Sequence, residues 1–141
     1  MYLIGYISYY MLIDGKKIDS ILGPITFLES NIFFLDLDNE MNIEIEDGVN
    51  FRNMILSLFG DQTFSIIIDT RGYAGQASME MIQYFTQDEK YNKQCSFQAI
   101  IQNNLSVKLG ANFYIKFLSK RVKAKLFTDY DSALSWILKQ L

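Results

Sequence analysis

The segment from Asp69 to Ser78 holds the side chains best suited to bind a partner or an anion. Six of its residues are candidates for binding a protein partner or a ligand: Asp69, Thr70, Arg71, Gly72, Tyr73 and Ser78. The segment follows an apolar run, and open sheets with parallel strands commonly bind ligands at the carboxyl ends of those strands. The guanidinium of Arg71 could hold an anion there. The structural alternative is that Asp69 and Arg71 bind each other while Gly72 and Gly75 form the turn.

A second group of acidic side chains has the alternation of a calcium-binding loop. Asp36, Asp38 and Glu40 are separated by single residues. However, Met41 stands where an EF-hand loop needs glycine, and no terminal glutamate follows at the required spacing. We therefore interpret these carboxylates as the solvated end of a strand, and we predict no metal site.

Cations concentrate near the carboxyl end of the chain. Residues 101–141 hold seven Lys or Arg and two Asp or Glu, whereas residues 1–100 hold six and fourteen. Five of the cations lie close together in sequence: Lys116, Lys120, Arg121, Lys123 and Lys125. They could contact an anionic lipid surface, a nucleic acid or an acidic partner, or they could favour a helix C-terminus and protect an edge strand. The net charge of −3 argues against general nucleic-acid binding.

The chain lacks the residues on which most enzymes and metal sites depend. It has no histidine and one cysteine, Cys95, which we expect in the core. A Ser-His-Asp or Cys-His device and an intramolecular disulfide are therefore impossible. No Walker loop or dinucleotide fingerprint is present either. We predict that the protein is not an enzyme and carries no cofactor, although a hydrolase or transferase built only on carboxylates or lysine stays an alternative.

Length and composition predict a single packed domain. The chain has 141 residues, half of them apolar, which suits one core. The apolar run 1–13 is shorter than the roughly 20 residues of a membrane-spanning helix, and it lacks the features of a secretory signal. We therefore expect a cytoplasmic protein with one domain over 21–141. Residues 1–20 are expected to form an arm, or a hairpin that turns at Asp14-Gly15, and their tyrosines could support a homodimer.

Hydrophobic periodicity predicts a mixed α/β fold of about four helices. The expected strands cover residues 25–29, 32–38, 42–46, 64–68, 96–101 and 123–127. The expected helices cover residues 49–59, a segment after Ser78, residues 105–118, and a segment after residues 128–131. The N-terminal strands read as an antiparallel pair turned at Ser30-Asn31, with 42–46 near a sheet edge. The later strands alternate with helices, which indicates right-handed crossovers.

Several polar residues and glycines are expected to mark helix ends. Asp47 and Ser78 are predicted N-caps, and Gly60 is a predicted helix stop. Thr86 and Glu89 have the spacing of a second capping box, at which the helix could bend. Gly110 is expected to allow close packing of the apolar helix 105–118.

Five short motifs in this order resemble the SpoIIAA-like branch of the STAS domains. They are residues 66–72 (IIIDTRG), 99–101 (AII), 109–113 (LGANF), 125–129 (KLFTD) and 133–136 (ALSW). The resemblance covers about residues 25–140. It implies a SpoIIAA-like mixed sheet and a bacterial, non-enzymatic regulatory or protein-interaction module.

The resemblance also implies a role for Ser78. Members of the family carry a serine that a partner kinase phosphorylates at the start of a helix, after an Asp-Ser-Ser-Gly-type loop. Ser78 falls near that place, but its neighbours Ala77 and Met79-Glu80 depart from the motif. As a phosphoacceptor it would place a doubly charged group at a helix N-terminus. As an ordinary residue it would only cap the helix.

A second function follows from a fold comparison. Relatives of this branch are compared with the lipid-binding SEC14 fold, which implies that the chain could instead bind a small ligand or lipid. The apolar helix 105–118 beside the basic end of the chain fits that alternative. A core without a pocket would exclude it.

Overall fold

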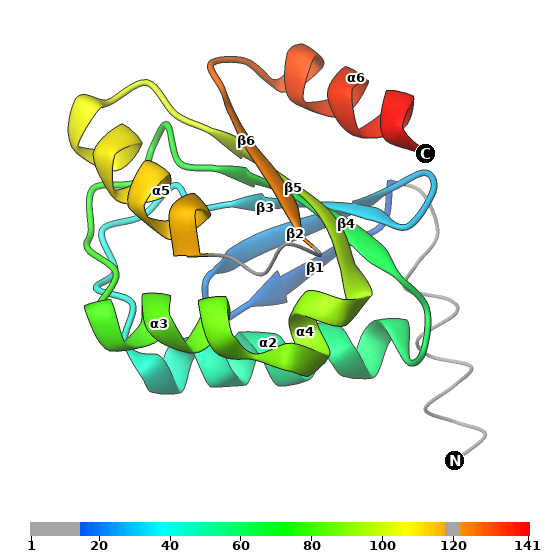
Figure 1. The fold of residues 1–141 in the computed structure, drawn as a ribbon, viewed down its shortest axis with the longest axis horizontal. Coiled ribbons are helices and arrows are strands. Elements are labelled where there is room, and N and C mark those ends of the chain that lie inside the picture. Colours follow the sequence, from blue (N-terminus) through cyan, green and yellow to red (C-terminus); the bar gives the residue numbers. More distant parts are fainter. Residues whose placement is uncertain (1–14, 118–121) are drawn as a thin grey trace.

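Six strands form one sheet in which the order along the chain is also the order in space (Figure 1). The computed structural model describes residues 15–117 and 122–141. The strands are β1 Lys17–Ser20, β2 Gly23–Leu28, β3 Ile32–Asp36, β4 Phe64–Asp69, β5 Cys95–Ile101 and β6 Lys123–Phe127. The described helices are α2 Ile45–Phe59, α3 Met79–Gln87, α4 Glu89–Gln94, α5 Leu105–Phe117 and α6 Tyr130–Gln140.

The sheet is mixed, as predicted. Strands β1, β2 and β3 pair antiparallel, and β3, β4, β5 and β6 pair parallel. The register places Asp36 opposite Asp69, Asp69 opposite Ile101, and Ile101 opposite Phe127. The four parallel strands therefore end at the same edge, and the loops that follow them lie next to one another.

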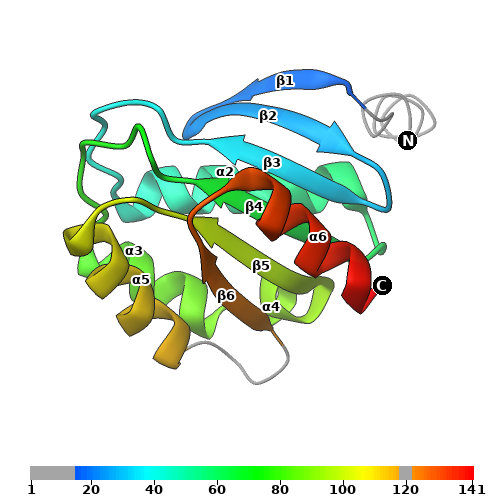
Figure 2. The same cartoon turned by 90° about the horizontal axis from the view of Figure 1, so that it is seen from above.

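Helices cover the two faces of the sheet unequally. Figures 1 and 2 show α6 on one face and α2, α3 and α4 on the other, with α5 beside α3 and β6. Connections between parallel strands are right-handed, so their helices lie on the same face of the sheet when the strand order does not reverse. The larger core therefore lies beneath the crossover helices. The smaller core lies under α6, whose Ala133 and Ile137 are fully buried.

Side chains along each parallel strand alternate between these two cores. On β4, Ile66 contributes to the core under the crossover helices, whereas Ile67 contributes to the core under α6. On the face covered by the crossover helices, β3 and β4 begin with aromatic core residues. Phe33 of β3 and Phe64 of β4 pack with Phe59 of α2, and the three ring centroids are 4.8–5.8 Å apart. Nearer the carboxyl ends of the strands the same face is aliphatic.

The N-terminal strands confirm one prediction and correct another. Ser30 and Asn31 connect β2 and β3 with φ values of 59° and 55°, which is the backbone of a two-residue hairpin turn. The predicted strand 42–46 is wrong. Ile43 makes a single parallel bridge to Ala77, and α2 begins at Ile45.

Helix ends follow the predicted residues with two corrections. Gly60 ends α2 with φ 60°. Its N-cap is Glu44 rather than the predicted Asp47. Asp47 instead occupies the third helical position, where its carboxylate accepts the Glu44 backbone N–H at 3.0 Å. The second capping box is also wrong. Thr86 donates to the Gln83 carbonyl at 2.8 Å, and the N-cap of α4 is Asp88.

The beginning of the chain joins the sheet at residue 17. Strand β1 pairs with β2, with Lys17 opposite Thr26. Residues 1–14 of the predicted arm or hairpin, and with them the tyrosines of the predicted dimer surface, lie outside the described residues. Within the described ranges, no helix has both the length and the apolar character to cross a membrane.

Candidate functional site

The loop after β4 is tied to the segment after β3 by a series of backbone hydrogen bonds. The Ala74 N–H donates to the Asn39 carbonyl at 2.9 Å, and the Ser78 N–H donates to the Ile43 carbonyl at 2.9 Å. In the opposite direction, the Ile43 N–H donates to the Gln76 carbonyl at 2.8 Å. The backbone of the predicted binding loop is therefore held in place along its length.

Two glycines allow this close contact. A Cβ atom at Gly75 would overlap the Met41 carbonyl, with its carbon only 2.7 Å away. A Cβ atom at Gly72 would overlap the side chain of Asp38. The loop lies against its neighbour at these points because both residues lack side chains.

Asp69 and Arg71 bind each other, as the structural alternative predicted. The Asp69 carboxylate accepts from the Arg71 backbone N–H at 3.0 Å and from its Nε and Nη2 at 3.0 and 2.9 Å. Burial alone would raise the pKa of Asp69, but these bonds hold it below its ordinary value. The Asp69 carboxylate also raises the pKa of Arg71. An anion at Arg71 would have to compete with this carboxylate.

Ser78 caps helix α3. Its hydroxyl oxygen accepts from the Met81 backbone N–H at 3.1 Å, and the residue is half-buried. This is the geometry of an ordinary N-cap. The structure therefore gives Ser78 a structural role, and phosphorylation of Ser78 stays a prediction.

The acidic segment after β3 has a local structural role. The Asp36 carboxylate accepts from the Asp38 backbone N–H at 3.0 Å, and Asp38 and Glu40 are exposed. Within residues 15–117 and 122–141, no group of acidic, cysteine or histidine side chains could hold a metal ion.

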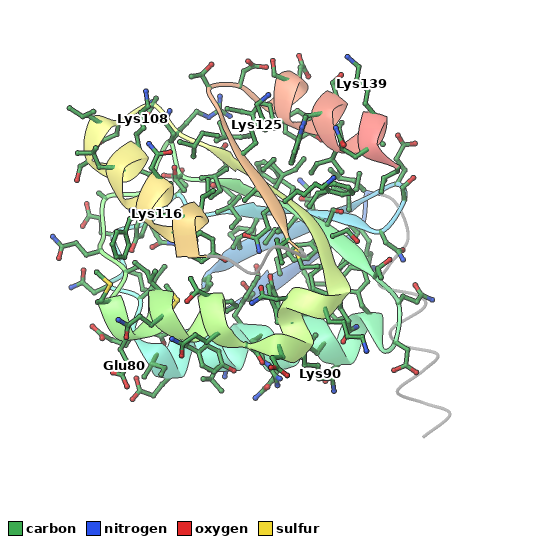
Figure 3. All side chains as sticks on the ribbon, viewed as in Figure 1. Glu80, Lys90, Lys108, Lys116, Lys125 and Lys139 are labelled. Atoms are coloured by element: carbon green, nitrogen blue, oxygen red, sulfur yellow. The ribbon has the colours of Figure 1, made fainter. Side chains whose placement is uncertain are left out.

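The described cations near the end of the chain lie on its surface. Figure 3 shows Lys108 and Lys116 on α5 and Lys125 on β6 pointing away from the ribbon. Lys123 and Lys125 are exposed on a strand that pairs on one side with β5, where cations protect an edge. Lys120 and Arg121 lie outside the described residues.

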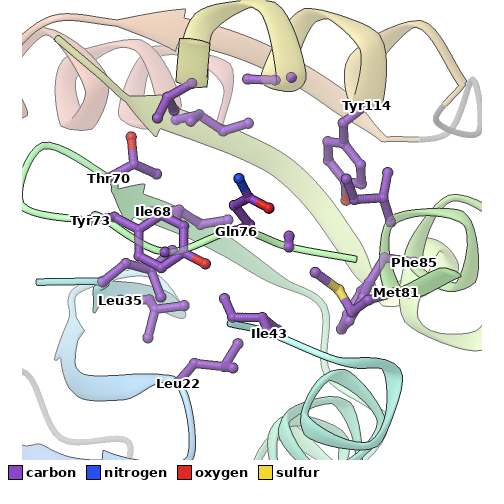
Figure 4. A pocket seen from close by; sticks show the side chains of 18 of the residues that line it. Leu22, Leu35, Ile43, Ile68, Thr70, Tyr73, Gln76, Met81, Phe85 and Tyr114 are labelled. Carbon is purple, nitrogen blue, oxygen red and sulfur yellow. The ribbon is translucent and has the colours of Figure 1, made fainter. Parts of the chain in front are cut away.

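A cavity of about 430 Å³ lies between α5, the sheet and the loop 70–78 (Figure 4). We call it the α5 cavity. Most of its wall is aliphatic or aromatic: Leu22, Leu35, Leu37, Ile43, Phe51, Ile66, Ile68, Met81, Ile82, Phe85, Ile100 and Val107. The aromatic cluster around Phe64 reaches it through Tyr91, whose ring centroid lies 5.4 Å from that of Phe64. The cavity lies in the half of the core nearer the carboxyl ends of the parallel strands.

Helix α5 forms one wall of this cavity. Its small residues Ser106, Gly110 and Ala111 line the cavity together with the larger Val107 and Tyr114, and a Cβ atom at Gly110 would meet nothing within 4 Å. The prediction that Gly110 allows close packing is therefore wrong, because this glycine borders open space. None of the α5 side chains that the structure describes is fully buried. Helices with so few buried contacts open more readily than core helices.

Three hydroxyl groups in the cavity wall donate to protein oxygens. Thr70 donates to the Ile101 carbonyl at 2.7 Å, and Tyr73 donates to the Met41 carbonyl at 2.8 Å. Tyr114 donates to the Gln98 side-chain oxygen at 3.2 Å. Burial raises the pKa of the Tyr114 hydroxyl above its ordinary value, so it stays protonated at neutral pH. Figure 4 shows Tyr73 and Tyr114 on opposite sides of the cavity.

Residues predicted from the sequence contribute only part of this site. Thr70 and Tyr73 line the α5 cavity, whereas Asp69, Arg71 and Ser78 do not. Gln98, whose side chain lines the cavity, was not predicted. The signal for it was present, because Gln98 is the one polar residue within the apolar run 97–101. Cys95 is buried as expected, and burial raises its pKa to about 12. Its thiol is therefore protonated and unreactive at neutral pH.

Comparisons with known proteins identify a family and a fold. The model of the family described as "Domain of unknown function (DUF7793)" matches residues 26–141. An uncharacterised DUF3478-family protein from Shewanella loihica PV-4, described as having a SpoIIAA-like fold, is similar in structure. It shares 18% sequence identity and a TM-score of 0.57, over 79% of this chain and 89% of that protein. No curated protein matches the sequence. The predicted SpoIIAA-like fold is therefore confirmed.

The contact between Gly75 and Met41 can be tested by substitution. Gly75→Ala should lower the free energy of unfolding by about 2 kcal/mol, because the added methyl group meets a backbone oxygen that cannot rotate away. Gly110→Ala is the matched control, and it should raise that free energy by about 0.5–1 kcal/mol through helix propensity alone. Urea denaturation measures both. Equal stability of Gly75→Ala and the unsubstituted protein would contradict the described packing of the loop.

Proposed function

The chain belongs to the DUF7793 family, and we propose that this member is a non-enzymatic module that binds an apolar small molecule in the α5 cavity. The observation that carries the proposal is the cavity itself. Its volume of about 430 Å³ lies within the range of about 300–1,000 Å³ typical of small-molecule sites. Its wall is mainly apolar with a few polar groups, which is the usual composition of such sites.

The chemistry of the wall favours binding over catalysis. The cavity residues that the structure describes include no Asp, Glu, Lys or Arg. General acid-base catalysis needs ionisable groups whose pKa values suit proton transfer. The hydroxyls of Tyr73 and Tyr114 have pKa values raised by burial, which makes them poor bases at neutral pH. A binding role needs only the shape and the apolar surface of the cavity.

The position of α5 supports a route into the cavity. The helix follows β5 and begins at a cap in which the Asn104 side chain accepts the Ser106 N–H at 2.8 Å. It forms the outer wall of the cavity and has no fully buried side chain among those described. A shift of this helix would expose the cavity at little cost in buried surface. The deeper walls belong to the sheet and α3 and would stay in place.

A substitution at Gly110 tests binding. Gly110→Leu directs a side chain into open space at a helical position where leucine is favoured over glycine, so the fold should be retained. We expect the variant to bind the neutral dye Nile red roughly tenfold or more weakly than the unsubstituted protein, because the added side chain occupies the cavity. Fluorescence titration measures the affinity.

Asn112→Leu is the matched control. It adds the same side chain two positions along α5, at an exposed residue outside the cavity wall. Its affinity for the dye should stay within roughly twofold of the unsubstituted protein. Saturable binding that is equally strong in both variants would place the dye elsewhere and contradict the proposal. Lack of any binding by the unsubstituted protein would also contradict it.

Protein interaction is a second candidate, favoured by exposed apolar side chains on α5. Leu105, Leu109 and Phe113 lie four residues apart and are 72%, 62% and 43% exposed. Spacing of four residues places them on one side of the helix. Apolar groups gathered on a surface commonly mark an interface.

The interaction surface can be separated from the cavity by substitution. Leu109→Gln changes an exposed residue outside the cavity wall, so dye affinity should be retained. A defined protein that binds the purified chain directly should bind this variant roughly tenfold more weakly, because an apolar anchor is lost. Lys108→Gln, also exposed on α5, is the control and should bind normally. An equal loss of affinity for the partner in Leu109→Gln and Lys108→Gln would indicate an electrostatic contact instead of an apolar one.

A further inference from the structure

The α5 cavity contains a buried amide with an unused hydrogen-bond donor. Gln98 is 1% exposed and projects from β5, opposite Ile66, on the face covered by the crossover helices. Its Oε1 accepts from the Tyr114 hydroxyl at 3.2 Å. Its Nε2 has no hydrogen-bond partner among the described residues. Buried amide donors are nearly always paired, because an unpaired donor loses its bonds to water without replacement.

A comparison with a second buried amide shows what is distinctive about Gln98. Asn92 also has one unpaired atom, Oδ1, but its Nδ2 donates to the Phe85 carbonyl at 2.9 Å. Asn92 does not line the cavity. Its amide therefore serves the turn between α3 and α4, whereas the free donor of Gln98 belongs to a residue of the cavity wall.

Among the described residues, none gives Gln98 Nε2 a regular hydrogen bond. Burial raises the pKa of Cys95 and a hydrogen-bonding contact with the Gln98 amide lowers it, so the two side chains are close. A thiol is a weak acceptor, and the Cys95 Sγ is directed to the Phe97 carbonyl at 3.7 Å. The Thr70 and Tyr73 hydroxyls donate to backbone carbonyls elsewhere. An acceptor on a molecule in the cavity would pair Nε2.

The electrostatic character of the wall restricts this molecule further. The cavity residues within the described part of the chain include no charged side chain. A carboxylate or ammonium group would lose its hydration there without a counter-charge, which is strongly unfavourable. An uncharged acceptor, such as a carbonyl oxygen, loses less hydration and gains a bond from the amide.

We propose that the α5 cavity binds an uncharged, mainly apolar molecule whose single acceptor oxygen is held by the Gln98 side-chain amide. This inference rests on the proposed binding function and adds the class of ligand and the residue that selects it. Gln98 is then a specificity-determining residue. Its Nε2 then donates to the acceptor oxygen of the ligand.

Three naphthalenes of similar size test the ligand class. We expect 1-acetylnaphthalene, which carries a ketone oxygen, to bind roughly fivefold more tightly than 1-ethylnaphthalene, which carries no acceptor. The anion 1-naphthoate should bind roughly tenfold or more weakly than the ketone, because the wall offers no counter-charge. Isothermal titration calorimetry on the full chain gives the three dissociation constants.

The role of Gln98 is tested in a double variant. Gln98→Met with Tyr114→Phe removes the amide together with the hydroxyl that donates to it, so neither group is left unpaired. The ketone and the hydrocarbon should then bind equally. The melting temperature should be equal to or above that of the unsubstituted protein, because replacing both partners by apolar groups of similar shape is neutral or stabilising.

Gln94→Met is the matched control for loss of a buried glutamine. Gln94 Nε2 donates to the Gly60 and Gln62 carbonyls at 2.7 and 3.1 Å, and the residue lies outside the cavity wall. This variant should have a lower melting temperature but should retain the preference for the ketone. The double variant should therefore lose the preference for the ketone without losing stability, whereas Gln94→Met should lose stability and keep the preference.

The outcomes separate the inference from the function on which it rests. Lack of binding by all three naphthalenes and by Nile red would overturn the binding function itself. Binding of the ketone and hydrocarbon with equal affinity, or a ketone preference that persists in the double variant, would overturn the role of Gln98 and leave the binding function standing. Tighter binding of naphthoate than of the ketone would overturn the uncharged class of ligand.

Discussion

The strand order of the sheet is the constraint on which the rest of the structure depends. Because the order never reverses, the crossover helices share one face, and α6 covers the other. Helices α2, α3 and α4 pack on the first three parallel strands and leave the last crossover, α5, at the side. Although Val107 and Tyr114 of α5 also face inward, the helix does not fill the space beneath it. The α5 cavity is thus a consequence of topology combined with the absence of large side chains at Gly110 and Ala111.

Much of the fold could be predicted because local signals agree with the tertiary structure. The Ser30-Asn31 turn, the buried run 64–68 and the cap at Ser78 each depend on a few adjacent residues, and all three are found where expected. The prediction at residues 42–46 failed because alternating polar and apolar residues fit both an edge strand and a loop with one buried residue. Ile43 is buried and makes a single bridge to Ala77. Ala77 belongs to a loop distant in sequence, so the local pattern could not show this contact.

The cavity could not be predicted because it is defined by atoms that are missing rather than by a motif. The sequence pattern identified α5 as apolar, but it does not show whether Gly110 borders a neighbouring helix or an empty space. The loop from Asp69 was correctly placed at the end of a central strand, yet its charged pair satisfies itself. Gln98 carried a usable signal, a polar side chain in a buried strand. Its meaning depended on the lack of a partner for Nε2, which only a structure reveals.

Methyl NMR of isoleucine-labelled protein most directly tests the claim that a ligand binds beneath α5. Isoleucines at neighbouring positions of a strand face opposite sides of the sheet, so their methyl signals distinguish the two cores. Ile66, Ile68 and Ile100 line the cavity, whereas Ile67 and Ile101 lie in the core under α6. Titration with 1-acetylnaphthalene should shift the methyl signals of the first three residues through the ring current of the ligand and leave the other two nearly unchanged. A saturating titration that shifts neither group, or shifts mainly Ile67 and Ile101, would contradict a ligand site beneath α5.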